Sequence, residues 1–466
     1  MIATNEDTIC AIASAPGNGA IAVVRLSGEN SFTIIDSLFH SPANNKRLSN
    51  QSANTIHFGS FQYHDTLIDE VLVSIFKAPH SYTGEDIVEI SCHGSLYIQQ
   101  QILQCLTQSG ARLANAGEFT MRAFLNGKMD LSQAEAVADL IASESNAAHK
   151  MAINQMRGGF SKEINALREK LLHFRSLIEL ELDFGEEDVE FADRNDLKNL
   201  ILKVSATIDH LVTSFSFGNV IKNGVPVTIA GRPNVGKSTL LNYFLKEEKA
   251  IVSEIAGTTR DSIEDEIIID GIHFRFIDTA GIRKTTDTIE SIGIERTFAK
   301  IGQAAIIILL ADGSQTPEDI KNQIIEMNPA NDQHLIVVVN KVDLCDEKEV
   351  IERFGGSDGF APYPTIFLSA KMHLHTELLT QMLLTTIRKR GDDTSNVIVS
   401  NARHYEALVN AQEATNRVLD GLVNGITSDF ISMDIRMILH YLGEITGEIT
   451  TDDVLRNIFS KFCIGK

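Results

Sequence analysis

The sequence is short of several residue types, and each shortage excludes a class of protein. Its 466 residues include no Trp and 5 Cys, which are scattered and never spaced as C-x-x-C. Paired C-x-x-C spacings mark zinc sites and an even set of cysteines marks a disulfide framework, so neither is expected here. Dispersed thiols in odd number fit a reducing cytoplasm, where we expect the protein to work.

Long hydrophobic runs are also missing. No apolar stretch reaches the ~18 residues that a membrane-spanning helix requires, so we expect no membrane span. The first residues, Met1 to Asp7, lack the basic region that opens a signal peptide. These absences again favour a cytoplasmic location.

Positive charge is the third shortage. The chain has 41 Lys and Arg against 62 Asp and Glu, which gives a formal net charge of -21. Since Lys and Arg drive binding to nucleic-acid phosphates, a broad nucleic-acid-binding face is not expected. Any RNA contact would have to come from a local basic patch or from a more basic partner.

The composition is otherwise that of a folded protein of about three domains, with 43% hydrophobic and 22% charged residues. From residue 1 to about 120, short β-like runs separated by turns surround one helical pattern at Ser95 to Gln108. This predicts an α+β module. Arg25 and Glu89 stand inside its strands, and the residues alone suggest two edge charges facing water.

Helical patterns dominate from Glu118 to Phe217. One Ala-rich helix is predicted over Leu131 to Met156, and the next has apolar residues at spacings of three and four from Ile164 to Ile178. The acidic run Glu179 to Glu190 is interpreted as a solvated face, with a metal cluster as the less favoured alternative. Further helices are predicted at Asp196 to Phe215, Ala402 to Val423, Met433 to Leu442 and Asp452 to Phe459.

The most informative stretch is Gly231-Arg232-Pro233-Asn234-Val235-Gly236-Lys237-Ser238. It follows the apolar run Val225 to Ala230 and precedes a helix start, which is the strand–loop–helix context of a phosphate-binding P-loop. The two glycines let consecutive backbone N–H groups point at one anion. Lys237 would reach the β- and γ-phosphates, and the Ser238 hydroxyl would bind Mg²⁺.

Three further motifs each follow an apolar strand. Asp278-Thr279-Ala280-Gly281 offers a carboxylate for Mg²⁺ through water and a backbone N–H for the γ-phosphate. Asn340-Lys341-Val342-Asp343 offers the Asp343 carboxylate to guanine N1–H and N2–H₂, which selects GTP over ATP. Ser369-Ala370-Lys371 would offer backbone N–H groups to guanine O6. Four motifs in this order predict a GTP-binding domain.

The expected catalytic residues depart from those of small GTPases. In those proteins a Gln directly after Asp-x-x-Gly orients the attacking water, but Ile282 stands in that place. One candidate to compensate is the loop Ser253 to Asp261, in which Thr259 is the expected second hydroxyl ligand to Mg²⁺. The other is the following segment with Glu290, although the residues alone favour a solvated helix-start glutamate there.

The changes of pattern divide the chain into four stretches. Residues 1–118 are expected to form the N-terminal α+β domain, 119–223 the first helical part, 224–390 the GTPase domain and 391–466 the second helical part. The simplest architecture inserts the GTPase domain into one helical domain. Insertion is tolerated where both ends of the insert lie close together. Motion in the GTPase domain would then reach the helical domain through the two chain segments that connect them.

Several of these features together resemble the MnmE (TrmE) family of bacterial and organellar tRNA-modification GTPases. They are the loop G-R-P-N-V-G-K-S, the segment A-G-T-T-R-D at 256–261, the inserted GTPase domain and the C-terminal stretch 462–466. The stretch 117–136, G-E-F-T-M-R-A-F-L-N-G-K-M-D-L-S-Q-A-E-A, is also typical of that family, and the resemblance covers the whole chain. It implies an N-terminal domain similar to tetrahydrofolate-binding domains, a helical domain and an inserted Ras-like GTPase domain.

The resemblance also implies an activity and partners. Family members are homodimers through the N-terminal domain and work with the FAD-containing protein MnmG, in a heterotetramer or larger complex. Together they add an aminomethyl or carboxymethylaminomethyl group to C5 of the wobble uridine of certain tRNAs. GTP hydrolysis requires Mg²⁺ and K⁺, and it drives dimerisation of the GTPase domains and a conformational change.

The family's K⁺ ligands fall on Asn234, Ser253, Ile255 and Thr258, whose amide, hydroxyl and carbonyl oxygens can replace the hydration shell of this large ion. The family's water-orienting glutamate falls on Glu290, acting through a second water, which reverses the interpretation from the residues alone. The residues expected at the GTP site, including the Mg²⁺ ligands Ser238 and Thr259 and the catalytic Lys237, are Asn234, Val235, Gly236, Lys237, Ser238, Thr239, Ser253, Glu254, Ile255, Ala256, Gly257, Thr258, Thr259, Asp278, Thr279, Ala280, Gly281, Asn340, Lys341, Asp343, Ser369, Ala370 and Lys371.

The family's contacts to a tetrahydrofolate derivative, 5-formyl or 5,10-methylene, fall on Arg25, Glu89, Lys128 and Lys466. A carboxylate can accept two N–H bonds from a pterin edge, and cations suit the glutamate tail. Cys463 stands beside these residues in the motif. A catalytic thiol and a small buried apolar thiol are equally compatible with the sequence.

Two other functions compete with tRNA modification. A ribosome-assembly GTPase shares the nucleotide core and often the K⁺ loop, but that class usually has a basic RNA-binding domain, which this acidic chain does not show. A folate-binding regulator with incidental GTP turnover is the weaker idea.

Overall fold

In the computed structural model, the described residues are 7–42, 46–183, 194–247, 265–277, 302, 304–330, 333–355, 359–391 and 397–465. The chain forms two compact units. The first comprises Met1–Ile141, Asn154–Ile201 and Glu413–Lys466, and the second comprises Ala142–Ile153 and Leu202–Gln412. These divisions fall inside helices, so the predicted domain boundaries stay predictions.

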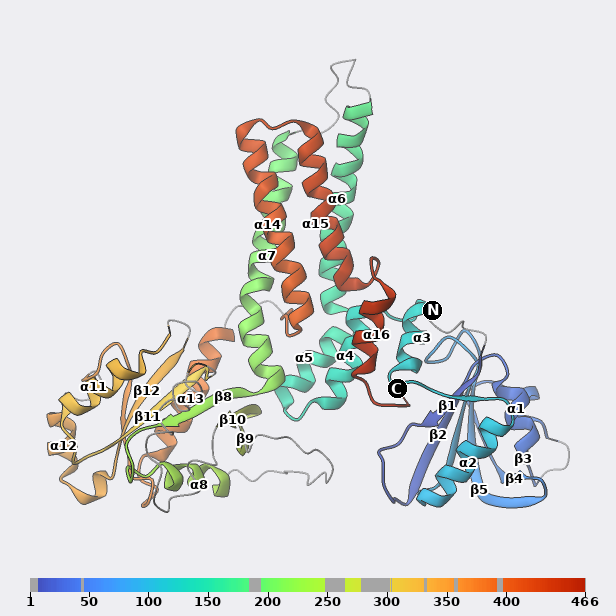
Figure 1. Ribbon diagram of the computed structural model, residues 1–466, viewed down its shortest axis with the longest axis horizontal. Helices are drawn as coiled ribbons and strands as arrows, with labels where there is room; N and C mark the ends of the chain where they lie inside the picture. The colour runs from blue at the N-terminus through green and yellow to red at the C-terminus, as the bar shows by residue number, and fades with distance from the viewer. Residues whose placement is uncertain are drawn as a thin grey trace. The chain divides into compact units, whose positions relative to one another are not determined.

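The N-terminal part of the first unit is a mixed sheet with the strand order β3-β4-β5-β6-β2-β1-β7 (Figure 1). Neighbouring strands are antiparallel except for β1 and β7, which are parallel. Helices α1 and α2 cover one face, where alternate strand residues such as Val24, Val73 and Ile90 are fully buried. The elements are β1 (Ile9–Ile12), β2 (Ile21–Ser27), α1 (Ser31–Leu38), β3 (Phe39–His40), η1 (Leu48–Asn50), β4 (Thr55–Tyr63), β5 (Thr66–Phe76), β6 (Ile87–His93), α2 (Leu96–Gln108) and β7 (Arg112–Leu113).

The C-terminal end of the chain lies against this N-terminal module. Helices α3 (Glu118–Leu125), α4 (Leu131–Ala142) and α16 (Asp452–Ser460) share a small core that contains Leu131 and Phe459. Gly117 has φ +66°, and a Cβ there would lie 2.6 Å from the Phe459 carbonyl oxygen, so this contact requires glycine. Ala116 and Ile464 form a β-bridge, which fixes the end of the chain beside α3.

The long helix predicted over Leu131 to Met156 is wrong, because two helices occupy that stretch. Helix α4 ends at Ala142 and α5 (Asn146–Met156) begins four residues later. The Ser145 side chain accepts a hydrogen bond from the Ala148 N–H at 3.1 Å, which caps the new helix. The Ala-rich pattern hid this break, since the capping serine sits between two helical stretches of the same character.

Long helices form the rest of the first unit and part of the second: α6 (Gly159–Asp183), α7 (Arg194–Asn223), α14 (Ala402–Asn424) and α15 (Ser428–Thr446). Helices α6 and α15 lie side by side (Figure 1). The apolar seam predicted on α6 is confirmed, with Ile164, Leu171 and Ile178 fully buried. Glu181 on α6 is buried and paired with Arg194 at 2.7 Å, so this residue of the acidic run is not solvated.

Helix α7 is the one described helix that is long and apolar enough to cross a membrane. A core helix of a soluble protein meets the same criteria of length and composition. Leu197, Val204 and Leu211 on α7 are fully buried inside the protein. This helix is therefore weak evidence for a membrane span.

The second unit contains a sheet in the order β13-β12-β11-β8-β10-β9, parallel except for the β9–β10 pair (Figure 1). Helices cover both faces. Leu240 and Leu383 lie in the core on one face, and Ile320 and Val350 lie in the core on the other. The elements are β8 (Val225–Ala230), α8 (Lys237–Glu247), β9 (Asp265–Ile269), β10 (Ile272–Phe276), β11 (Ile306–Asp312), α11 (Pro317–Met327), β12 (His334–Asn340), η2 (Val342–Leu344), α12 (Glu347–Arg353), β13 (Thr365–Phe367) and α13 (Thr376–Gly391). The predicted α/β class of this part is confirmed.

Candidate nucleotide-binding site

The predicted P-loop joins β8 to α8, as the sequence indicated. Its two glycines have φ +144° at Gly231 and +106° at Gly236. A Cβ on Gly231 would lie 2.2 Å from the Leu310 carbonyl oxygen, and one on Gly236 would lie 2.3 Å from Asn340 Nδ2. Both positions therefore require glycine for conformation and for space.

Lys237 closes this loop from its helical end. Its Nζ donates hydrogen bonds to the carbonyl oxygens of Gly231 at 2.5 Å and Arg232 at 2.9 Å. Burial lowers the pKa of this ammonium group. Ser238 and Thr239 follow in the first turn of α8, where the helix dipole favours anions.

Asn340, at the end of β12, connects the P-loop to the predicted guanine loop. Its Nδ2 donates to the Val235 carbonyl oxygen at 2.7 Å, and its Oδ1 accepts from the Ala370 N–H at 3.0 Å. The side chain is buried, so losing either bond would leave a polar group unsatisfied at a cost of about 1–3 kcal/mol. The structure thus brings together three of the four predicted motifs through one side chain.

Asn340 and Ala370 belong to the motifs 340–343 and 369–371, and the other residues of these motifs lie nearby in the chain. Lys341 has φ +66°, and its Nζ lies 2.5 Å from Asp312 Oδ2 at the end of β11. Burial works to raise the pKa of Asp312, but the hydrogen bond from Lys341 outweighs it and the pKa is lowered. Asp343 is exposed in η2, and Lys371 is exposed beside Ala370.

Two carboxylates that the sequence patterns did not single out lie at this site. Asp312 is one of them, and its position at the end of an apolar run was the available signal. The other is Asp319 on α11, whose Oδ1 lies 3.0 Å from Nη2 of the P-loop residue Arg232. The neighbouring Asn234 is exposed with φ +61°, a left-handed conformation that Asn tolerates better than most residues.

Part of the predicted site lies outside the described residues. These residues are Ser253, Glu254, Ile255, Ala256, Gly257, Thr258, Thr259, Asp278, Thr279, Ala280, Gly281 and Glu290, together with Lys466 of the predicted folate site. Their roles therefore stay predictions.

The folate residues Arg25 and Glu89 lie in the first unit, and their interpretation as water-facing edge charges is wrong. They face each other across the central strands β2 and β6. Arg25 Nε and Nη2 lie 2.9 and 2.8 Å from the same oxygen, Glu89 Oε1. The Arg25 guanidinium also lies 5.6 Å from the ring centroids of Tyr82 and Phe119, so the pair is partly enclosed.

The C-terminal segment contacts this pair. Arg25 Nη1 donates to the Gly465 carbonyl oxygen at 3.4 Å. Cys463 is exposed, so the alternative of a buried apolar thiol is wrong. Lys128 Nζ donates to the Pro79 carbonyl oxygen at 2.8 Å, and the structure gives no contact between Lys128 and Arg25 in the described residues.

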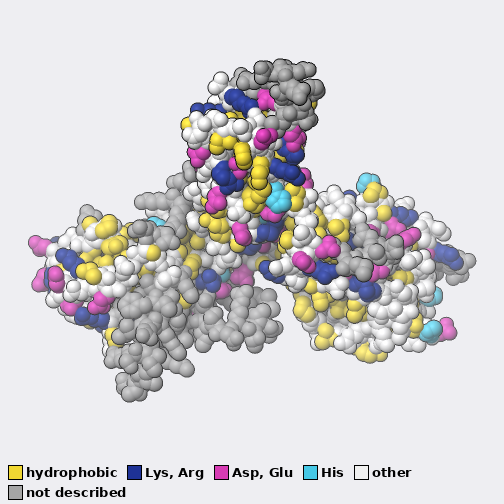
Figure 2. Space-filling model, turned by 45° about the horizontal axis from the view of Figure 1, so that its top comes forward, with side chains coloured by type: hydrophobic (Ala, Val, Ile, Leu, Met, Phe, Trp, Pro, Cys, Tyr) yellow, Lys and Arg dark blue, Asp and Glu magenta, His cyan; other side chains and the backbone are white. Residues whose placement is uncertain are grey.

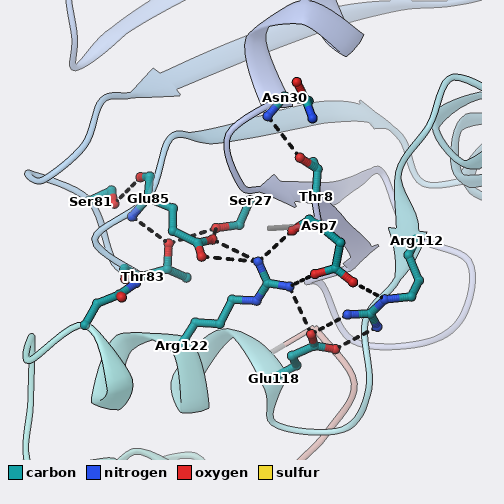
Figure 3. Close-up of polar contacts among 11 residues, drawn as sticks. Asp7, Thr8, Ser27, Asn30, Ser81, Thr83, Glu85, Arg112, Glu118 and Arg122 are labelled. Carbon is teal, nitrogen blue, oxygen red and sulfur yellow. Dashed lines mark hydrogen bonds and ion pairs between the residues drawn. The ribbon is translucent and has the colours of Figure 1, made fainter. Parts of the chain in front are cut away.

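A cluster of charged side chains that the sequence analysis did not single out lies in the same module (Figure 3). The buried Arg122 donates from Nη2 to Asp7 Oδ1 at 2.5 Å and to Glu118 Oε1 at 3.1 Å, and from Nη1 to Glu85 at 3.2 Å. Arg112 forms a two-bond pair with Glu118 at 2.6 and 3.0 Å. Glu118 and Arg122 stand four residues apart on α3, and this spacing was the available signal.

Comparisons with known proteins cover the whole chain. A family profile described as "GTP-binding protein TrmE N-terminus" matches residues 8–128, and one described as "MnmE helical domain" matches residues 131–463. A protein named tRNA modification GTPase MnmE from Bacteroides fragilis is 55% identical over 99% of this chain and 100% of its own length. The protein of that name from Christiangramia forsetii is 52% identical over 99% of each chain.

A solved structure, the FeoB G-domain from Methanococcus jannaschii, overlaps 35% of this chain and 98% of its own, at 22% identity and a TM-score of 0.24. A likeness this low adds nothing to the family assignment. The family profiles and the full-length relatives, together with a P-loop that Asn340 connects to the guanine loop, support one conclusion. The chain belongs to the MnmE (TrmE) family of tRNA modification GTPases.

Proposed function

We propose that this GTPase acts with an FAD-containing MnmG partner to add an aminomethyl or carboxymethylaminomethyl group to C5 of the wobble uridine of certain tRNAs. The observation that carries the nucleotide half of this proposal is the Asn340 side chain, which bonds Val235 and Ala370 at 2.7 and 3.0 Å. The Asn340 side chain thereby links the phosphate loop to the loop that would hold guanine. The names of the full-length relatives support the tRNA half and leave the ribosome-assembly alternative without support.

The described residues Ser238 and Asn234 offer oxygen ligands that suit Mg²⁺ and K⁺. The Ser238 hydroxyl on the first turn of α8 and Thr259 would hold Mg²⁺, and the exposed Asn234 amide with Ser253, Ile255 and Thr258 would hold K⁺. Bound there, the two cations would neutralise charge on the phosphates. The chain's own groups would do the rest: Lys237 would bind the phosphates, and Glu290 would orient the attacking water.

A tetrahydrofolate derivative fits the Arg25–Glu89 pair. Both bonds from Arg25 reach Glu89 Oε1, which leaves Oε2 to accept from the N–H edge of a pterin. The rings of Tyr82 and Phe119 beside the guanidinium would flank such a planar ligand. The bound folate would supply a one-carbon group, while Lys128 and Lys466 would hold its glutamate tail.

A homodimer through the N-terminal module fits the second face of its sheet. On this face Ile56, Phe58 and Leu72 are 67%, 53% and 47% exposed. Phe58 lies directly opposite Leu72 across β4 and β5, so the exposed apolar side chains form one continuous area. Apolar areas of this kind are typical of protein–protein interfaces, which supports the predicted dimer.

The RNA contact is proposed to depend on MnmG. In the view of Figure 2, Lys and Arg side chains are interspersed with Asp and Glu. Such a mixed surface binds phosphates weakly, and the net charge of -21 opposes binding further. A more basic partner would therefore supply much of the affinity for tRNA.

Mass spectrometry of wobble uridines tests the proposal. Cells that lack this protein should lose the modified uridine, and expression of the protein should restore it. Lys237→Ala should fail to restore it because the variant cannot bind the phosphates, whereas Lys203→Ala, an exposed lysine on α7, should restore it fully. Unchanged wobble uridines in cells without the protein would refute the proposed function.

A further inference from the structure

Another polar cluster lies in the second unit, outside the nucleotide site and the Arg25–Glu89 pair. His273 on β10, Glu266 on β9 and Glu144 in the turn before α5 bring an imidazole nitrogen and two carboxylate oxygens within 4.8 Å of one another. This is the one group of metal-ligating side chains found in the part of the chain that the structure describes. We propose that it binds a divalent transition-metal ion of the zinc type.

Two of the three ligand atoms already have the spacing that zinc requires. His273 Nε2 lies 3.4 Å from Glu266 Oε2. Tetrahedral zinc with bonds of about 2.0–2.2 Å holds neighbouring ligand atoms about 3.4 Å apart. Glu144 is exposed, and its carboxylate already has an oxygen within 4.8 Å of the other two ligand atoms.

The imidazole is also held in a suitable orientation. Gly224 has φ +79°, and a Cβ at this position would lie 3.0 Å from His273 Nδ1. The Nδ1 edge of the ring therefore lies against the Gly224 backbone, and the Nε2 edge faces the carboxylates. The side chain of His273 is 12% exposed, so its position is fixed by packing while its ligand atom stays accessible.

The backbone that carries Glu144 is tied to the hairpin that carries the other two ligands. The Ala147 N–H donates to the carbonyl oxygen of Gly271, in the β9–β10 turn, at 3.4 Å. The Ser145 cap fixes the same segment to the start of α5. The three ligands therefore belong to one locally anchored structure.

The ligand types favour zinc over the hard cations. Mg²⁺ and Ca²⁺ prefer shells made of oxygen, whereas an imidazole nitrogen with carboxylates suits Zn²⁺. Arg275, the cross-strand partner of Glu266, lines the same open cavity of about 1120 Å³. The cavity gives ions and a fourth, water ligand access to the site.

The site adjoins two of the predicted nucleotide motifs in the chain. In the sequence, β9 begins four residues after the predicted Mg²⁺-binding loop 253–261, and β10 ends two residues before Asp278. A metal ion held by Glu144, Glu266 and His273 would cross-link the strands between these motifs to the start of α5. The ion would restrain the hairpin relative to that helix.

Isothermal titration of the tag-free full-length protein with ZnCl₂, in buffer with K⁺ and saturating Mg²⁺-GDP, tests the proposal. We expect one zinc site per chain, with binding weakened at least tenfold by His273→Gln and by Glu144→Gln. His80→Gln changes an exposed histidine of the first unit and should bind zinc like the unaltered protein. Circular dichroism of each variant checks that the fold is kept.

A second measurement tests the cross-link itself. Zn²⁺ should raise the melting temperature of the protein and of His80→Gln, and should leave that of His273→Gln unchanged. Equal zinc affinity in His273→Gln and the unaltered protein, or displacement of zinc by millimolar Mg²⁺, would overturn the proposal. Either outcome would leave the proposed tRNA modification untouched, because that function does not use this site.

Discussion

At the scale of single residues, the nucleotide site depends on close backbone contacts that side chains other than glycine would break. Gly236 combines φ +106° with a distance of 2.3 Å from its would-be Cβ to Asn340 Nδ2. Asn340 in turn holds both Val235 and Ala370. A methyl group at Gly236 would therefore disturb the phosphate loop and the predicted guanine loop together.

We predict that Gly236→Ala lowers GTP affinity at least 100-fold, because Asn340 must move away from Val235. The measurement is binding of a fluorescent GTP analogue. Gly110→Ala is the matched control, since Gly110 has φ +104° and no atom within 4 Å of its would-be Cβ. It should cost about 1–3 kcal/mol of stability, because a side chain is strained at this φ, and leave GTP affinity unchanged. Equal affinities in the two variants would contradict the account.

The sequence predicted the motif residues well but not their connections. Gly231, Gly236, Lys237 and Asn340 could be identified because their types and spacing are set by the chemistry of phosphate and guanine. The partners Asp312 and Asp319 could not, since their roles depend on where β11 and α11 end in space. Arg25 and Glu89 show the same limit, because strand order, unknown from the sequence, makes them central partners.

At the scale of elements, caps and ion pairs determine where helices begin and how they dock. The break between α4 and α5 is an example, since Ser145 ends one Ala-rich stretch and caps the next. The predicted apolar seam of α6 needed no such information, because its period alone determines which face is buried.

We predict that Ser145→Ala lowers the stability of the second unit by about 1 kcal/mol, the usual cost of losing a helix cap. Differential scanning calorimetry measures this effect. Ser176→Ala is the control, because Ser176 is exposed within α6 and its hydroxyl bonds the Leu172 carbonyl oxygen. Alanine is the better helix former there, so no loss is expected. A loss of similar size in both variants would contradict the assigned cap.

The charged cluster around Arg122 predicts acid sensitivity of the N-terminal module. Burial works to raise the pKa of Glu118, but its hydrogen bonds with Arg112 and Asn115 outweigh burial and the pKa lies below its ordinary value of 4.5. For Asp7 too, the bonds from Arg112 and Arg122 outweigh burial and lower the pKa. A lowered folded-state pKa stabilises the fold above pH ~4.5, and this stability is lost as the pH falls further.

Calorimetry between pH 7 and pH 3.5 tests this prediction. The melting temperature of the unaltered protein should fall steeply below pH ~4.5, and Glu118→Gln should melt lower at pH 7 but show a flatter pH dependence. Glu169→Gln, an exposed carboxylate on α6, should behave like the unaltered protein. An unchanged pH profile in Glu118→Gln would show that this carboxylate does not contribute.

At the scale of the whole molecule, the proposed function combines a nucleotide site in the second unit with a folate site in the first. The fold class and the family could be predicted from the sequence, because motif order and apolar periodicity carry that information. The zinc-type cluster could not, because Glu144 is more than a hundred residues away from Glu266 in the chain. Only the folded hairpin brings these side chains together.

GTP turnover in KCl and in NaCl tests the central claim most directly, which is that K⁺ held by Asn234 and the loop 253–261 neutralises charge on the phosphates. We predict turnover at least tenfold faster in KCl for the unaltered protein and for Asn242→Ala, a control at an exposed asparagine on α8. Asn234→Ala should be slow in both salts. Equal rates in the two salts, or full K⁺ stimulation in Asn234→Ala, would contradict the account.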